Sequence, residues 1–264
     1  MLYFLCDLIL PIYTRINGPR VSTAAPKNAT IGITKRSGKQ SLYLVKTYRD
    51  RYVFLFFYKN LQKKNIISTN GVISILELEE KILKEGKVLP GNVLKVDSFL
   101  NHRIDAAFTM KMGKEIAKLY KDSQINKIVT IETSAIPIAF AAAYAMEIPM
   151  VFAKKNKSKN ISPSVYSSRV MSFTHGNEYD AVISRDYLSS DDKVLVIDDF
   201  LATGSALCGL LDIVKQAGAE VIGCAIGIEK GFQGAGDKLR ASGIRVESLA
   251  IVDSMSENLL VFRH

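Results

Sequence analysis

The stretch VLVIDDFLATGSA, residues 194–206, decides the fold of this chain. Its first four residues are aliphatic and predict a buried strand, which ends at the paired acids Asp198 and Asp199. The small residues 202–206 predict a tight turn, and apolar residues at helical spacing follow it as far as Gly218. A strand, an acidic pair and a turn into a helix thus follow one another directly.

This turn is suited to an anion. Backbone N–H groups at a helix start bind anions, and the hydroxyl groups of Thr203 and Ser205 add donors. Two acids beside the turn do not suit a bare phosphate, but they can accept hydrogen bonds from sugar hydroxyl groups. The spacing matches neither a P-loop nor the glycine pattern of a dinucleotide fold. We therefore expect a site for a phosphorylated sugar.

Strands and helices alternate around this stretch. Such alternation predicts an α/β fold whose parallel sheet is flanked by helices, with ligands beyond the carboxyl ends of the strands. Upstream, one helix is expected to end near Gly86 and another to be capped by Asp105. Residues 154–164 are polar and basic and predict a mobile loop, and an antiparallel hairpin follows. The predicted strands are 127–132, 149–153, 194–199, 220–229 and 244–252, the hairpin covers 165–173 and 178–188, and helices are expected near 136–146 and 237–242.

Composition indicates a globular protein. The chain has 264 residues, 48% of them hydrophobic and 23% charged, and no apolar run approaches the length of a membrane span. The apolar start is interrupted by Asp7 and Pro11 and lacks the basic residues of a signal peptide. Cys6, Cys208 and Cys224 show no metal-type spacing. We expect reduced thiols, two of them in the core, and a cytoplasmic protein.

Charge divides the chain. Residues 1–71 contain 12 Lys and Arg but 2 acids, whereas residues 72–264 contain 23 basic and 24 acidic residues. The net charge of +9 therefore comes from the first part alone. This break predicts a boundary near Gly71, with a basic extension over 1–71 and a folded domain over 72–264.

Several segments of the larger part resemble one family. Together with DDFLATGSA (198–206), they resemble the type I phosphoribosyltransferases, in particular those that act on xanthine, over nearly all of 75–255. The resemblance implies the fold of that family, with a small hood formed by the N-terminal segment. It also implies transfer of the 5-phosphoribosyl group from 5-phosphoribosyl-1-pyrophosphate (PRPP) to xanthine, with Mg²⁺, by a cytoplasmic homodimer in purine salvage. The segments are LPGNVLKVDSFLNHRID (89–105), KIVTIETSAIPIA (127–139), VFAKKNKS (151–158), IVKQAGA (213–219), IEKGFQ (228–233) and RVESLA (245–250).

The resemblance also implies roles for individual residues. Asp198 and Asp199 match the catalytic acids that bind the ribose hydroxyl groups. Glycine is usual in that family where this chain has Ala135, and alanine resists some backbone geometries that glycine permits. The PRPP phosphate loop matches Ala202, Thr203, Gly204, Ser205 and Ala206, the pyrophosphate loop matches Glu132, Thr133, Ser134 and Ala135, and the xanthine contacts match Leu94, Asn101 and Lys230.

The chemistry of the side chains agrees with these roles. Xanthine has oxo groups at C2 and C6, to which Lys230 and the Asn101 amide can donate. Phe232 is expected either to stack on the purine or to lie in the core. In the basic loop, Lys154 and Lys155, together with Lys157, are expected to close over the pyrophosphate.

The basic extension has three interpretations. It is a nucleic-acid arm, a disordered or membrane-surface segment, or upstream sequence translated from an over-long gene model, which we favour. The first suggests an alternative function, a purine-operon repressor with an N-terminal DNA-binding domain. Residues 1–71 lack the capped amphipathic helices that a winged helix requires, so nucleic acid is not expected as a partner. The apolar segment 48–60 is too short to span a membrane, so no membrane is expected either.

Overall fold

The structure is a computed structural model that describes residues 40–47, 51–58, 72–155, 164–171, 178–256 and 259–264. The chain divides into two units, residues 1–64 and 65–264. The described part of the first unit is an antiparallel hairpin of β1 (Gln40–Thr47) and β2 (Arg51–Tyr58). We expected no element there, although aromatic and β-branched residues such as those of 51–58 favour strands.

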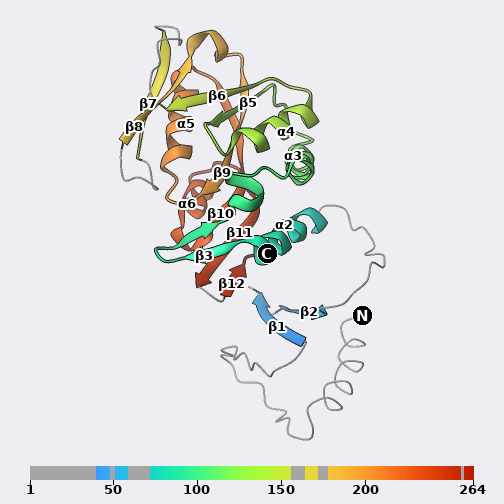
Figure 1. The fold of residues 1–264 in the computed structure, drawn as a ribbon. Coiled ribbons are helices and arrows are strands. Elements are labelled where there is room, and N and C mark those ends of the chain that lie inside the picture. The colour runs from blue at the N-terminus through green and yellow to red at the C-terminus, as the bar shows by residue number, and fades with distance from the viewer. Residues whose placement is uncertain (1–39, 48–50, 59–71, 156–163, 172–177, 257–258) are drawn as a thin grey trace, which may run out of the picture. The chain divides into compact units, whose positions relative to one another are not determined.

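The second unit is built on one eight-stranded sheet (Figure 1). Its strand order is β12-β11-β10-β9-β5-β6-β8-β7, and the central run from β11 to β6 is parallel. The sequence-based prediction of a parallel sheet flanked by helices is therefore confirmed. The five parallel strands are β5 (Lys127–Ile131), β6 (Met150–Lys155), β9 (Lys193–Leu201), β10 (Glu220–Lys230) and β11 (Val246–Ser256).

Antiparallel strands extend both edges of the sheet. β7 (Val165–Met171) and β8 (Glu178–Ser184) form the predicted hairpin, which joins the sheet through β8 and β6. At the other edge β12 (Leu259–Phe262) pairs with β11, a strand that the sequence analysis did not predict.

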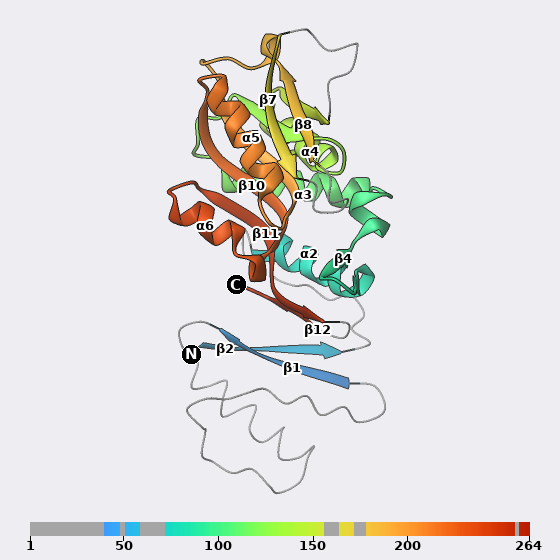
Figure 2. The same cartoon turned by 90° about the vertical axis from the view of Figure 1, so that its left-hand side faces the viewer.

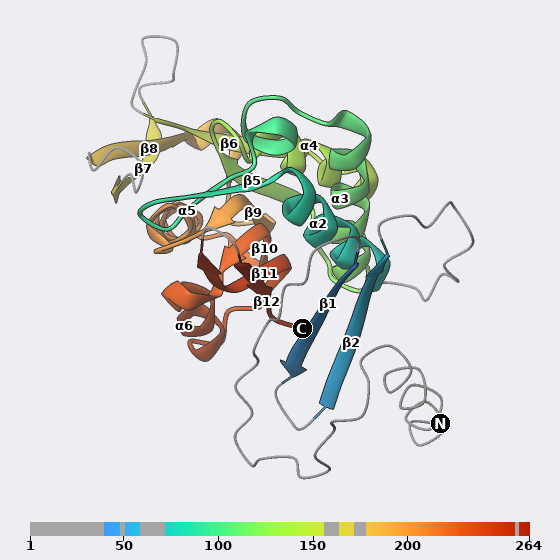
Figure 3. The same cartoon turned by 60° about the horizontal axis from the view of Figure 1, so that its bottom comes forward.

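Helices cover both faces of the sheet (Figures 2 and 3). In β9 the run 194–197 is continuously apolar because side chains on both faces of the strand are buried. Leu195 and Ile197 pack toward the helices of one face, and Val194 and Val196 pack toward those of the other. The first face carries α2 (Val72–Glu85), α3 (Ala106–Leu119) and α4 (Ile136–Met146), and the second carries α5 (Ser205–Gln216) and α6 (Ala235–Ala241).

The predicted ends of the helices agree with the structure. Helix α2 ends at Glu85, directly before Gly86. Asp105 caps α3, and its side chain accepts a hydrogen bond from the backbone N–H of Phe108 at 3.1 Å. This bond satisfies one of the free N–H groups at the helix start.

Two short elements follow α2 and lead to the site. The hairpin of β3 (Lys87–Leu89) and β4 (Val93–Lys95) precedes the π-helix η1 (Asp97–Asn101). Phe99 and Leu100 of η1 are fully buried, so this segment is anchored in the core. The β3–β4 hairpin and η1 together correspond to the N-terminal segment that we expect to form a hood.

The cysteines only partly match the expectation. Cys224 is buried in β10, but Cys208 is exposed on α5, so one rather than two of the described thiols lies in the core. Cys208 faces outward because the apolar face of α5 is formed by its neighbours Leu207 and Leu210. Cys6 lies outside the described residues. Within the described ranges, no helix has both the length and the apolar character required to cross a membrane.

Candidate active site

The predicted site residues gather at the carboxyl edge of the parallel strands. Chain order runs from β5 to β6 on one side and from β9 through β10 to β11 on the other. The sheet therefore changes direction between β5 and β9, which is where ligands bind in open α/β sheets. The loop after β5 carries Glu132, and the end of β9 carries Asp198 and Asp199.

The acidic pair is largely withdrawn from solvent. Asp198 is only 4% exposed, and its Oδ1 accepts a hydrogen bond from the backbone N–H of Asp199 at 3.0 Å. Burial raises the pKa of Asp198 well above its usual value, and the charge of Asp199 raises it further. Burial also raises the pKa of Asp199, although hydrogen bonds from its neighbours oppose this shift. Hydrogen bonds from bound hydroxyl groups would therefore stabilise the ionised pair by compensating its lost hydration.

The turn after β9 has the backbone form that its sequence predicts. Gly204 adopts a φ of 86°, a left-handed conformation that favours glycine, and immediately precedes α5. Its carbonyl accepts a hydrogen bond from the N–H of Cys208 at 2.8 Å. Thr203 is exposed, while the Ser205 hydroxyl oxygen accepts a hydrogen bond from the N–H of Met171 in β7 at 3.0 Å. The start of α5 thus follows the two acids after one short turn.

The loop after β5 leads directly into α4. Glu132 Oε1 accepts a hydrogen bond from the backbone N–H of Lys155 at 2.6 Å, which joins this loop to the end of β6. Thr133 is exposed and Ser134 is half-buried. Ala135 has an ordinary right-handed conformation, with φ −76° and ψ −20°, and is buried. The alanine therefore needs none of the geometries that only glycine allows.

Three residues expected at the base lie on the hood side of the site or at the end of β10. Asn101, the last residue of η1, donates from its amide Nδ2 to Asp199 Oδ2 at 2.6 Å. Lys230 ends β10, and its Nζ donates to the carbonyl of Asn92 at 2.9 Å. Burial lowers the pKa of Lys230. Leu94 lies in β4 with its side chain in the core. The structure thus brings Asn101 together with the acidic pair.

The basic loop begins later than expected. Lys154 and Lys155 belong to β6, because β8 pairs with both residues and extends the strand. The prediction that these two lysines lie in a loop is therefore wrong. The Lys155 ammonium lies 5.3 Å from the ring centre of Tyr179, and its charge lowers the pKa of Asp198. Lys157 lies outside the described residues.

Sequence reasoning missed three contributors to the site. The backbone carbonyl of Asn92 holds Lys230, and the Phe200 ring lies 5.8 Å from the same ammonium. Tyr179 of β8 lies close enough that Asp198 raises its pKa, after the larger effect of its burial. Phe200 directly follows the acidic pair and could have been found there, but no sequence signal marks Asn92 or Tyr179. Phe232 is 37% exposed in η3 (Gly231–Gln233), so it is not a core residue.

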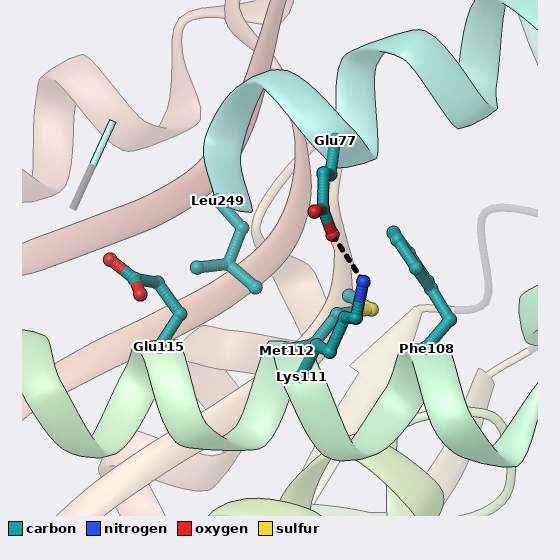
Figure 4. A pocket seen from close by; sticks show the side chains of 6 residues that line it. All are labelled: Glu77, Phe108, Lys111, Met112, Glu115 and Leu249. Carbon is teal, nitrogen blue, oxygen red and sulfur yellow. Dashed lines mark hydrogen bonds and ion pairs between the residues drawn. The ribbon is translucent and has the colours of Figure 1, made fainter. Parts of the chain in front are cut away.

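A small pocket lies elsewhere, between α2, α3 and β11. The Lys111 ammonium donates to Glu77 across it at 2.8 Å (Figure 4). None of its lining residues is among those predicted for the site, so it is separate from the acidic pair. The lining residues are Glu77, Phe108, Lys111, Met112, Glu115 and Leu249.

Comparisons with known proteins agree with this architecture. Residues 100–242 match the model of the phosphoribosyl transferase domain family. A xanthine phosphoribosyltransferase of Brevibacillus brevis is 49% identical over 180 residues, which is 68% of this chain and 92% of the relative. One of Alkaliphilus metalliredigens is 50% identical over 186 residues, covering 70% of this chain and 92% of the relative.

Solved structures show the same fold at greater distance. The adenine phosphoribosyltransferase of Giardia lamblia, solved with 9-deazaadenine, superposes with a TM-score of 0.58 at 20% identity. The match covers 69% of this chain and 98% of that one. The family match extends over more than half of the chain, and the relatives are about half identical over two thirds of it. The chain therefore belongs to the phosphoribosyltransferase family, with xanthine phosphoribosyltransferases as its relatives.

Proposed function

We propose that this protein transfers the 5-phosphoribosyl group from PRPP to xanthine, forming xanthosine 5′-monophosphate and pyrophosphate in purine salvage. One observation carries the proposal. The acidic pair lies at the end of β9, at the switch point of the sheet and directly before the turn into α5, and Asn101 is hydrogen-bonded to Asp199. The identity to xanthine phosphoribosyltransferases supports xanthine as the base.

Each part of PRPP has a matching region of the site. The 5′-phosphate would lie on the N–H groups of 202–206, and its sugar hydroxyl groups would donate to Asp198 and Asp199. The pyrophosphate would lie at the loop 132–135 that follows β5. This arrangement uses the buried carboxylates as acceptors, which offsets the cost of burying them.

The purine would lie between the hood and the end of β10. Lys230 can donate to the C6 oxo group and the Asn101 amide to the C2 oxo group of xanthine. Both side chains already donate to protein oxygens, at 2.9 Å and 2.6 Å respectively. Adenine would instead require an acceptor for its exocyclic amine. The exposed ring of Phe232 is available to stack on the purine.

The reaction needs no protein nucleophile. Breakage of the bond between ribose C1 and the pyrophosphate builds positive charge on the sugar ring, as in glycoside chemistry. The protein holds the base nitrogen and the ribose carbon in line, which reduces the entropic part of the barrier. Asp198 is buried, and exclusion of water from this part of the site would keep water from competing with the base.

Mg²⁺ fits this site as a partner of the substrate. Within the part of the chain that the structure describes, no three His, Cys, Asp or Glu side chains are grouped as metal ligands. Mg²⁺ commonly takes only one or two carboxylates and completes its shell with water and phosphate oxygens. When bound with PRPP it would neutralise pyrophosphate charge, and Asp198 or Asp199 would be its protein contacts.

The finer properties also form part of this proposal. We place the catalytic fold in residues 72–264, with 1–71 as an extension, and the protein in the cytoplasm as a homodimer. Helix α4 supports the homodimer, because it is apolar on all sides and its exposed residues would contact the second subunit. Phe140 and Tyr144 of this helix are 59% and 68% exposed. These residues are four apart and lie on one face.

The proposal is tested by pyrophosphate release from PRPP and Mg²⁺ with xanthine, hypoxanthine, guanine and adenine in parallel. Both the full chain and residues 72–264 are assayed. A rate dominated by xanthine in both proteins supports the enzyme and the division of the chain. If none of the four bases is converted although PRPP binds measurably, the proposal is refuted and the repressor is favoured. DNA binding by the full chain would then be the next measurement.

A further inference from the structure

A buried ion pair lies directly behind the base side of the site. Glu229 is 1% exposed and immediately precedes Lys230 at the end of β10. Arg240 of α6 holds both carboxylate oxygens, with Nη1 to Oε1 at 3.0 Å and Nη2 to Oε2 at 2.6 Å. The Ser248 hydroxyl of β11 donates to Oε2 at 2.5 Å. Because side chains alternate along a strand, Glu229 and Lys230 lie on opposite faces.

The ion pair joins the segments on both sides of the turn that follows Lys230. Arg240 belongs to the last turn of α6, so its fork connects that helix to the end of β10. The backbone of α6 also approaches the carboxylate closely, since a Cβ atom added at Gly236 would overlap Glu229 Oε1. The turn 231–234 is thereby held at both ends.

A second ion pair, which Arg240 Nη1 also reaches at Asp237 Oδ1 (3.4 Å), holds the start of α6. Asp237 accepts a hydrogen bond from Arg263 Nη1 at 2.8 Å, and Arg263 Nη2 lies 2.6 Å from Asp253 of β11. This second pair does not include Glu229. The start of α6, where Ala235 faces Gly204 of the PRPP loop, therefore keeps an anchor when Glu229 is changed.

Stability alone is a weak reason for this pair. A buried ion pair loses much hydration, and well-packed apolar residues are often as stabilising. A bidentate arginine instead fixes geometry, because its planar fork meets a carboxylate in one orientation. The Arg240 guanidinium holds Glu229, which directly precedes Lys230, so the geometry that it fixes is that of the backbone at Lys230.

We propose that Glu229 and Arg240 are positioning residues that set where the Lys230 ammonium lies at the base site. This inference rests on the proposed function, in which Lys230 donates to the purine. Loss of the Glu229 charge releases the end of β10 from α6 and lets Lys230 move from its 2.9 Å contact with Asn92. The effect falls on the base, because the PRPP loop 202–206 lies after the neighbouring strand β9.

The test compares Glu229→Gln with Asp192→Asn in the full chain. Asp192 is a matched control, since it is also buried, at 7% exposure, and ion-paired, with Lys127 at 2.9 Å. It lies at the amino end of β9, at the opposite edge of the sheet from the site. Each variant is assayed for its Tm, its kcat, and its KM for xanthine and for PRPP.

We expect both variants to lower the Tm, but only Glu229→Gln to raise the KM for xanthine, by about tenfold or more, because small displacements at a reacting site are costly. Its KM for PRPP is expected to stay within about threefold of wild type, because the loss of even one hydrogen bond to the charged PRPP would raise this KM by more than that. Arg240→Lys keeps the charge but loses the fork, and we expect an intermediate KM for xanthine. If Glu229→Gln lowers the Tm but leaves this KM unchanged, the pair is only structural and the inference is wrong.

A second measurement separates this inference from the proposed function. The rate at which acetic anhydride labels the Lys230 amine is followed by mass spectrometry in all variants and needs no activity. Faster labelling in Glu229→Gln, and not in Asp192→Asn, supports the positioning role. Wild type that turns over no base refutes the proposed function, whereas unchanged labelling of Lys230 refutes the inference.

Discussion

Replacement of Gly204 by alanine is the sharpest test of the PRPP loop. Gly204 has a φ of 86°, and a Cβ atom added there would lie 3.2 Å from the Cβ of Ala235. The left-handed conformation costs a non-glycine residue about 1–2 kcal/mol. The tight contact adds on the order of 1 kcal/mol, the lower end of the cost of overpacking. We therefore expect a loss of about 2–3 kcal/mol, which for a domain of this size lowers the Tm by roughly 5–10 °C.

The functional effect of Gly204→Ala follows from the same geometry. If the loop relaxes, its N–H groups no longer point at one phosphate position. Loss of one hydrogen bond to a charged group costs about 1.5–3 kcal/mol, so the Kd for PRPP should rise at least about tenfold. Calorimetric titration with PRPP and Mg²⁺ measures the Kd, and differential scanning calorimetry measures the Tm.

Gly234→Ala is the matched control for this change. Gly234 also has a positive φ, 72°, but a Cβ atom there would have nothing within 4 Å. Alanine at this position therefore has the cost of the left-handed backbone conformation without a tight contact, and the position lies outside the PRPP loop. If Gly204→Ala binds PRPP within about twofold of wild type while both variants lose equal stability, the loop does not bind the phosphate as argued.

The acidic pair and the lysines of β6 give two further predictions. Because the pKa values of Asp198 and Asp199 are raised, PRPP should bind more weakly as the pH falls and these acceptors become protonated, as titrations over a pH series will show. Because these pKa values are raised, the folded state binds more protons than the unfolded state, and the contribution of the pair to stability falls as the pH rises through the raised pKa. Asp198→Asn should therefore flatten this part of the profile of Tm against pH. An unchanged profile would contradict the raised pKa of Asp198. Neutralising Lys154 and Lys155 together should lower kcat far more than PRPP affinity, and unchanged kcat would remove both from the mechanism.

Much of the fold follows from local patterns. The apolar run 194–197, the small residues of α4 and the Asp105 cap each depend on neighbours within a few residues, and each was predicted correctly. The site was accessible for a related reason, because in parallel sheets the carboxyl ends of strands meet at one edge. The order of motifs along the chain therefore indicated which loops converge.

The sequence by itself determined the five parallel strands, the β7–β8 hairpin, the main helices and the edge at which the acidic pair lies. Only the tertiary structure decided which distant atoms meet: Asn101 bonds Asp199 across 98 residues, and Lys230 bonds the Asn92 carbonyl across 138. Lys155 became part of a strand because β8 pairs with it, although its own neighbours are polar. Such pairings depend on the interaction energy between segments that are far apart in the sequence, which a local sequence pattern does not contain.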